Sequence, residues 1–64
     1  MTKAEILLEI KANMKFISMS QKTLAEKIGM TQPQLSRILG GINDPSVSNL
    51  IKICEALGMT VYVV

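Results

Sequence analysis

Apolar residues recur every three or four positions along most of the chain, the spacing that collects them on one face of an α-helix. Thr2 and Glu5 have the spacing of a capping box, so we expect a first helix from there to about Phe16 or Ile17. Its predicted buried stripe consists of Ile6, Leu7, Ile10, Met14 and Ile17. Because an isolated helix is marginally stable, other helices must cover this stripe.

Three further helices are expected over 21–28, 32–39 and 47–57, each preceded by a hydroxyl side chain and followed by glycine. The hydroxyls belong to Ser20, Thr31 and Ser46, and Gln34 completes a second capping box with Thr31. The inward residues of the second and third helices are Leu24, Ala25, Ile28, Leu35, Ile38 and Leu39. The fourth carries more apolar residues than one stripe holds: Val47, Leu50, Ile51, Ile53, Cys54 and Leu57. Residues 60–64 are rich in β-branched side chains and favour a strand.

Composition narrows the possible functions. The 64 residues suffice for one domain, predicted over 1–64, and 48% of them are hydrophobic, which is more than a small globule easily hides. Either the interior is unusually apolar or another chain covers part of the surface. With no histidine and only Cys54, one chain cannot build a zinc cluster or a disulfide framework, so we expect no metal and no cofactor.

Charge is unevenly distributed along the chain. Residues 1–19 carry +1, residues 20–43 carry +2 and residues 44–64 carry −1, so the positive surplus lies in the middle. No segment reaches the ~18–20 apolar residues of a membrane span. Charged residues occupy the N-terminus, where a signal peptide has its apolar run. We therefore expect a cytoplasmic protein without membrane contact.

The segment 21–39 reads QKTLAEKIGMTQPQLSRIL. Its small Ala25 allows two helices to cross closely, and Gly29 allows a positive φ in the turn between them. The segment resembles the helix-turn-helix of the lambda repressor and Cro type, the Xre family, and the resemblance extends over about residues 5–58. It implies an all-α, compact four-helix lambda-repressor-like domain. Two departures are Ser18, where a glycine is common, and the expected strand, where many members have a fifth helix.

A recognition helix enters the major groove with its N-terminal end forward, so the outer face of the third helix is expected to meet the bases. That face presents Gln32, Pro33, Ser36 and Arg37. Glutamine suits adenine and arginine suits guanine, whereas proline offers only an apolar contact, for example to a thymine methyl. Gln34 is expected to cap the helix instead. For two of these residues an alternative to base contact stays open. Ser36 can serve only as a small residue that lets the helix lie deep in the major groove, and Arg37 can form an ion pair within the protein.

Contacts to the DNA backbone are expected from Gln21, Lys22, Thr31, Asn43 and Ser46. The resemblance places Gln21 against a phosphate and beside Gln32, and it places Asn43 next to the backbone or a base. Helix N-termini favour anions, which supports phosphate contacts near Lys22 and Ser46. These contacts position the domain without reading the sequence of the DNA.

The resemblance also implies a homodimer that reads two half-sites about 34 Å apart. Both faces of the expected strand are apolar, as in strands that are covered on both sides. We expect Val61, Tyr62, Val63 and Val64 to pair antiparallel with the symmetry mate, next to an apolar surface of the fourth helix. The alternative is a strand that folds back on its own domain.

These features predict a sequence-specific transcriptional regulator, a repressor, that binds palindromic double-stranded DNA as a homodimer. The alternative is an antitoxin that neutralises a partner toxin and autoregulates its operon. A third hypothesis is a protein-interaction module without DNA contacts. Because the chain lacks histidine, a suggestive carboxylate pair and a phosphate-binding glycine loop, we do not expect an enzyme.

Overall fold

Four α-helices make up the computed structural model, which describes residues 2–60. They are α1 (Lys3–Phe16), α2 (Gln21–Ile28), α3 (Gln32–Leu39) and α4 (Val47–Ala56). These bounds agree with the predicted ones to within a residue, and the predicted four-helix, all-α architecture is confirmed. Residues 2–60 contain no strand, and Thr60 has no regular structure. The rest of the expected strand, Val61, Tyr62, Val63 and Val64, lies outside the described residues.

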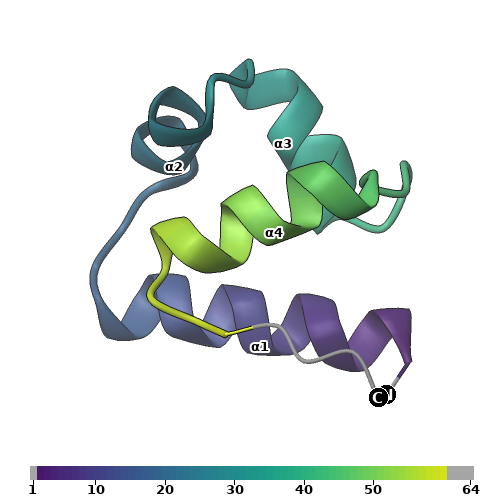
Figure 1. Cartoon of the computed structure of the whole chain (residues 1–64), viewed down its shortest axis with the longest axis horizontal. Coiled ribbons are helices and arrows are strands. Elements are labelled where there is room, and N and C mark those ends of the chain that lie inside the picture. The colour runs from purple at the N-terminus through teal and green to yellow at the C-terminus, as the bar shows by residue number, and fades with distance from the viewer. Residues whose placement is uncertain (1, 61–64) are drawn as a thin grey trace.

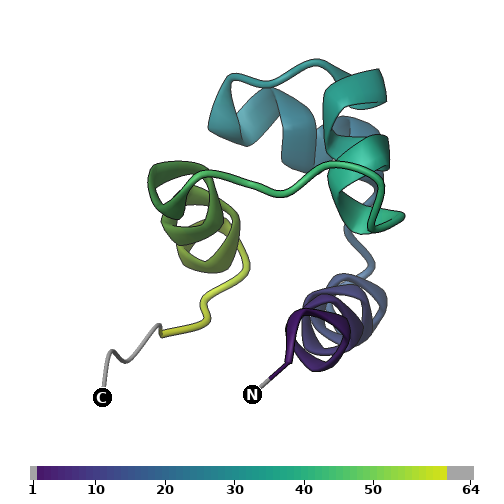
Figure 2. The ribbon, with the colours of Figure 1, turned by 90° about the vertical axis from the view of Figure 1, so that its right-hand side faces the viewer.

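The helices are arranged in two groups. Figure 1 shows α2 and α3 together at one end of the molecule, and α1 and α4 on the side away from the turn that joins α2 to α3. Figure 2, turned by 90°, shows α1 and α4 nearly end-on, so the axes of these two helices are roughly parallel. Helix α2 packs against both α3 and α4. The α2–turn–α3 unit therefore packs against α4 through α2.

Each helix begins at the hydroxyl side chain that was expected to cap it. The hydroxyl oxygen accepts a hydrogen bond from the backbone N–H three residues on, over 3.1–3.3 Å. The four capping residues are Thr2, Ser20, Thr31 and Ser46. In α1 the Glu5 carboxylate also accepts the N–H of Thr2 over 3.1 Å, and this bond is the main cause of a lowered Glu5 pKa. Each cap contributes about 1 kcal/mol to stability.

Each helix also ends in the same way. A residue with positive φ follows the last turn, and the N–H of the next residue donates to a carbonyl five positions earlier, as in a Schellman motif. These bonds, 2.8–2.9 Å long, join Met19 to Met14, Met30 to Ala25, Ile42 to Arg37 and Met59 to Cys54. The residues with positive φ are Gly29, Gly41, Gly58 and, after α1, Ser18. Serine therefore occupies, at φ 56°, a conformation that glycine adopts more readily.

The hydrophobic core draws on all four helices. Its largest fully buried side chains are Ile10, Leu24, Leu35, Leu39 and Ile53. Burying an aliphatic side chain of this size stabilises the fold by about 1.5–3 kcal/mol. Cys54 is also buried, as expected for a small apolar residue of α4, and burial raises the pKa of its thiol.

Part of the predicted apolar pattern lies outside this core. Ile17, predicted in the buried stripe, is 42% exposed, so that prediction is wrong. The reason is that α1 ends at Phe16 and the backbone of Ile17 turns away from helical geometry, with ψ 7°. On the outer side of α1, Leu8 is 67% exposed and Phe16 is 88% exposed, which the sequence reasoning did not anticipate. The apolar surplus of the chain is therefore partly on α1.

Candidate nucleic-acid interface

A glycine and a close helix contact shape the turn between α2 and α3. Gly29 has φ 72°, and a Cβ there would meet no atom within 4 Å, so only the backbone conformation favours glycine. Ala25 is 2% exposed and belongs to the core, where α2 packs against its neighbours. A larger side chain at this position would push the helices apart. The structure therefore agrees with the prediction of a buried Ala25 in α2 and of a positive φ at Gly29 in the turn.

One side of α3 is buried and the other is exposed. The buried residues are Leu35, Ile38 and Leu39. The four candidates for base contacts, Gln32, Pro33, Ser36 and Arg37, are all exposed. At 3.6 residues per turn they share a sector of about 140° of the helix surface, opposite the buried side. The fold therefore brings the predicted base-contacting residues together on one continuous outer face.

Gln34 belongs to the same helix, but its side chain is already engaged. Its Oε1 accepts the backbone N–H of Thr31 over 3.0 Å, and the Thr31 hydroxyl accepts the N–H of Gln34 over 3.3 Å. This reciprocal pair is a capping box. The expectation that Gln34 caps α3 is confirmed.

Arg37 connects the outer face of α3 with the loop that follows. Within residues 2–60 its guanidinium makes no ion pair, so the internal alternative considered for Arg37 does not form there. The carbonyl of Arg37 accepts the N–H of Ile42 over 2.9 Å and that of Asn43 over 3.3 Å. These bonds hold Asn43, a candidate for a backbone contact, close to the end of the same helix.

The five candidates for contacts to the DNA backbone come from α2, the start of α3 and the loop before α4. Lys22, Thr31, Asn43 and Ser46 are exposed, and Gln21 is half-buried at the start of α2. Thr31 and Ser46 cap their helices by accepting N–H bonds, and a hydroxyl that accepts can still donate its hydrogen outward. Capping is therefore compatible with phosphate contact. The described residues contain no hydrogen bond between Gln21 and Gln32, so that contact stays a prediction.

A contact that the sequence reasoning missed ties α1 to the loop after α3. The Lys3 ammonium donates to the carbonyl of Gly41 over 3.1 Å and forms an ion pair with Asp44. Both members of the ion pair are exposed, so it contributes only about 0–1 kcal/mol to stability. Together the two contacts link the N-terminus of α1 to the loop that carries Asn43. No local signal could have revealed it, because Lys3 and Gly41 are 38 positions apart.

A family model described as "Helix-turn-helix" matches residues 17–63, well over half of the chain. The matched region contains α2, α3 and α4 with the turn between the first two. Comparisons with curated proteins and with solved structures found no match. Among residues 2–60, no helix combines the length and the apolar character needed to cross a membrane.

Proposed function

Because the chain belongs to the helix-turn-helix family of the lambda repressor and Xre type, we propose that it is a sequence-specific DNA-binding repressor. Residues 1–64 act as one domain, α3 lies in the major groove, and α2 crosses the DNA backbone. The observation that carries this proposal is the outer face of α3, where four exposed side chains gather opposite three buried ones. The family is one of DNA-binding regulators, and the proposal includes no catalytic step.

Two side chains of that outer face account for most of the proposed base reading. Arg37 donates two hydrogen bonds to a guanine, and Gln32 pairs bidentately with an adenine. Since the Arg37 guanidinium has no ion pair within residues 2–60, binding a base breaks no such pair there. Ser36 is small enough to let the helix approach closely, and the Pro33 ring contacts a thymine methyl.

Contacts to phosphates position α3 without selecting a sequence. In this proposal Gln21 and Lys22 bind a phosphate at the start of α2, and Thr31, Asn43 and Ser46 bind others around α3. The exposure of four of these residues and the +2 charge of residues 20–43 support the assignment. Replacing Lys22 by alanine is expected to weaken binding equally for all sequences and to reduce the salt slope by about 1.

A homodimer places two copies of α3 in successive major grooves, about 34 Å apart, and so reads a palindromic operator. The exposure of Val47 and Ile51 on α4 supports a contact there, because these apolar side chains lie outside the core. We propose that the second copy covers them together with residues 61–64. Light scattering is expected to give a dimer for the full chain and a monomer after removal of residues 60–64. A monodisperse monomer of the full chain at micromolar concentration contradicts this arrangement.

Selection of binding sites from random DNA tests the proposed sequence reading. A palindromic motif is expected to be enriched, and Arg37→Ala is expected to cost about 1–3 kcal/mol and to relax specificity at one base pair. Lys27→Ala is the matched control, since Lys27 is an exposed α2 residue outside the proposed interface. Failure to enrich any motif, or an equal loss of affinity for Lys27→Ala, contradicts the proposal.

The antitoxin alternative uses the same DNA contacts but adds a toxin as partner. It predicts that a second chain co-purifies with this protein from its source and that the protein abolishes the toxicity of that chain. Purification without a partner, together with a defined operator, favours the repressor instead.

A further inference from the structure

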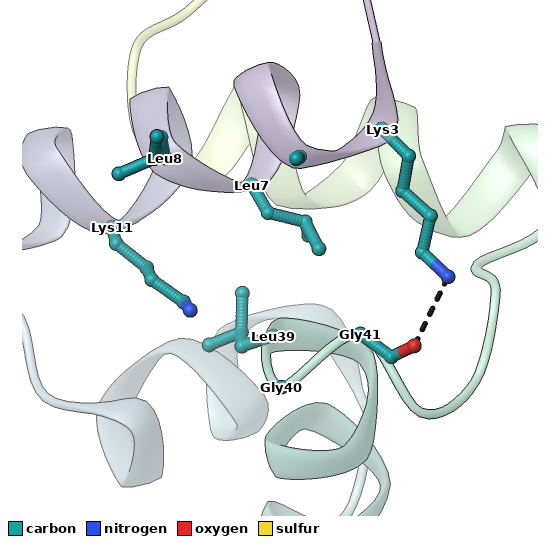
Figure 3. A pocket seen from close by; sticks show the side chains of 8 residues that line it. Lys3, Leu7, Leu8, Lys11, Leu39, Gly40 and Gly41 are labelled. Atoms are coloured by element: carbon teal, nitrogen blue, oxygen red, sulfur yellow. Dashed lines mark hydrogen bonds between the residues drawn. The ribbon is translucent and has the colours of Figure 1, made fainter.

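Lys3 bridges the start of α1 and the segment 40–46 that joins α3 to α4 (the α3–α4 loop). Figure 3 shows its side chain extending from α1 to Gly41, at one end of a groove between α1 and the end of α3. The Lys3 ammonium donates to the Gly41 carbonyl over 3.1 Å and forms an ion pair with Asp44. Lys11, the other lysine that borders the groove, forms no ion pair within residues 2–60. One side chain of α1 therefore contacts the α3–α4 loop at two points.

The position of Lys3 in its own helix is electrostatically unfavourable. Lys3 is the first residue of α1, where unpaired N–H groups give a helix terminus its partial positive charge. A cation is disfavoured there, whereas Glu5, in the same turn, has the favoured sign. The ion pair with Asp44 joins two exposed side chains and therefore adds little to stability. Because these two effects are small and opposed, folding stability gives little reason for a lysine at this position.

The charge of Asp44 matters because of its neighbours in the α3–α4 loop. Asp44 is the only charged residue of the segment 40–46, and it lies between Asn43 and Ser46, two of the proposed phosphate contacts. At about 3.8 Å per residue, its Cα lies no more than about 8 Å from either of theirs, comparable to the Debye length at physiological salt. A free carboxylate at this distance repels phosphates, whereas one paired with an ammonium adds no net charge. Lys3 therefore removes the negative charge from a loop that faces an anion in the proposed complex.

The α3–α4 loop is also tied to α3. The carbonyl of Arg37 accepts the N–H of Ile42 over 2.9 Å and that of Asn43 over 3.3 Å. Gly41 comes directly before these two residues and binds Lys3 through its own carbonyl. Three consecutive residues of the loop are thus held by α3 on one side and by α1 on the other. A change at Lys3 is therefore transmitted to Asn43 through one residue of backbone.

We propose that Lys3 is a positioning residue for DNA binding, which holds the α3–α4 loop and neutralises Asp44. With this charge cancelled, Asn43 and Ser46 approach the phosphates without repulsion. The inference rests on the proposed function, because it requires DNA to be the ligand of the α3 face. Lys3 acts through the loop in this arrangement. The competing arrangement, in which its ammonium binds a phosphate directly, gives a different result in the test.

A double-mutant cycle on the full chain tests the proposal, with fluorescence anisotropy measuring affinity for the operator selected from random DNA. Lys3→Met removes the charge and the donor but keeps a side chain of similar length. It is expected to weaken operator binding about fivefold, the order of magnitude for two partly screened charges near a protein surface. In the Asp44→Asn chain the same substitution is expected to weaken binding at most about twofold, because only the exposed hydrogen bond to Gly41 is then lost.

Two further variants serve as controls. Lys11→Met removes the same charge from an exposed α1 residue on the same groove and is expected to weaken binding at most about twofold. Lys3→Arg keeps the charge and the donors and is expected to retain the affinity within about twofold. Thermal unfolding is expected to give Lys3→Met nearly the Tm of the unchanged chain, because losing the ion pair is offset by removing a cation from the start of α1.

The outcomes separate this inference from the proposed function. An equal loss for Lys3→Met with and without Asp44→Asn indicates a direct phosphate contact and overturns the inference, as does an equal loss for Lys11→Met. If the unchanged chain and Lys3→Met bind the selected operator equally, only the inference is overturned. If the unchanged chain selects no operator, the proposed function is overturned together with it.

Discussion

Replacing Ser18 by glycine is expected to stabilise the protein, because position 18 has a backbone conformation that disfavours a side chain. Ser18 has φ 56°, whereas the corresponding residues after α2, α3 and α4 are glycines with φ of 72°, 79° and 71°. A residue with a Cβ pays a steric cost in this left-handed region, which glycine avoids. Since Ser18 is exposed, the substitution removes no buried contact.

Two opposing terms determine the size of the effect. Removing the Cβ relieves roughly 1–2 kcal/mol of steric conflict. Glycine also gives the unfolded chain more freedom, which lowers stability by about 0.5–1 kcal/mol. The midpoints of these two ranges differ by about 0.75 kcal/mol, which is the net gain expected in the free energy of unfolding. For a domain of this size, such a gain raises Tm by about 3–6 °C.

Far-UV circular dichroism during thermal and urea unfolding measures this difference. All variants are compared at one protein concentration, because the Tm of any protein that associates depends on its concentration. Gly29→Ala is the reverse control. A Cβ at position 29 meets no atom within 4 Å, so the expected loss of about 1 kcal/mol comes from φ alone. Ser18→Ala keeps the Cβ and is expected to lie within about 0.5 kcal/mol of the unchanged chain.

The reasoning is refuted if Ser18→Gly is no more stable than the unchanged chain while Gly29→Ala loses stability. That outcome would mean that position 18 bears no steric cost comparable to the one at position 29. Equal gains for Ser18→Gly and Ser18→Ala would also refute it, since they would attribute the effect to the hydroxyl group.

Three further predictions concern a cap, a carboxylate and a thiol. Thr31→Ala is expected to lower the free energy of unfolding by about 1 kcal/mol and Thr31→Ser to retain it, because the hydroxyl caps α3; equal urea unfolding curves contradict this. The pKa of Glu5 is lowered because the Thr2 N–H donates to its carboxylate. The ionised carboxylate therefore stabilises the folded protein fully at pH values above its ordinary pKa of 4.5, and this contribution is lost as pH falls through the lowered pKa. Thermal melts of the unchanged chain and of Glu5→Gln should therefore converge in acid, and a pH-independent difference argues against stabilisation by the charged carboxylate. Burial raises the pKa of the Cys54 thiol, so iodoacetamide should alkylate it slowly in the native protein and rapidly in urea; rapid native alkylation is inconsistent with its burial.

The ends of the helices could be predicted because their signals are local. The Ser46 hydroxyl bonds to an N–H only three residues away, and Gly58 permits the positive φ that follows α4. Helical spacing likewise separates the buried Leu35 from the exposed Arg37 within a single turn. The outer face of α3 could therefore be drawn from the sequence, while the role of each residue on it stays a prediction.

Burial along α1 could not be predicted in the same way. Ile17 continues the spacing of the inner stripe, yet it is exposed because the helix ends one residue earlier. Leu8 and Phe16 are as apolar as the core residues, and their spacing is equally helical. Only the direction in which α1 faces its neighbours distinguishes them from Leu7, which is buried.

The sequence by itself determined four helices, their order, their caps and the helix-turn-helix, because each of these depends on residues within about a turn or two of one another. The tertiary structure alone decided that Lys3 binds the loop at Gly41 and Asp44, and that a groove opens beside Lys11. These features join segments that are distant in the chain. Their geometry depends on how whole helices pack, and the periodicity of one segment carries no information about the angle and distance of its neighbours.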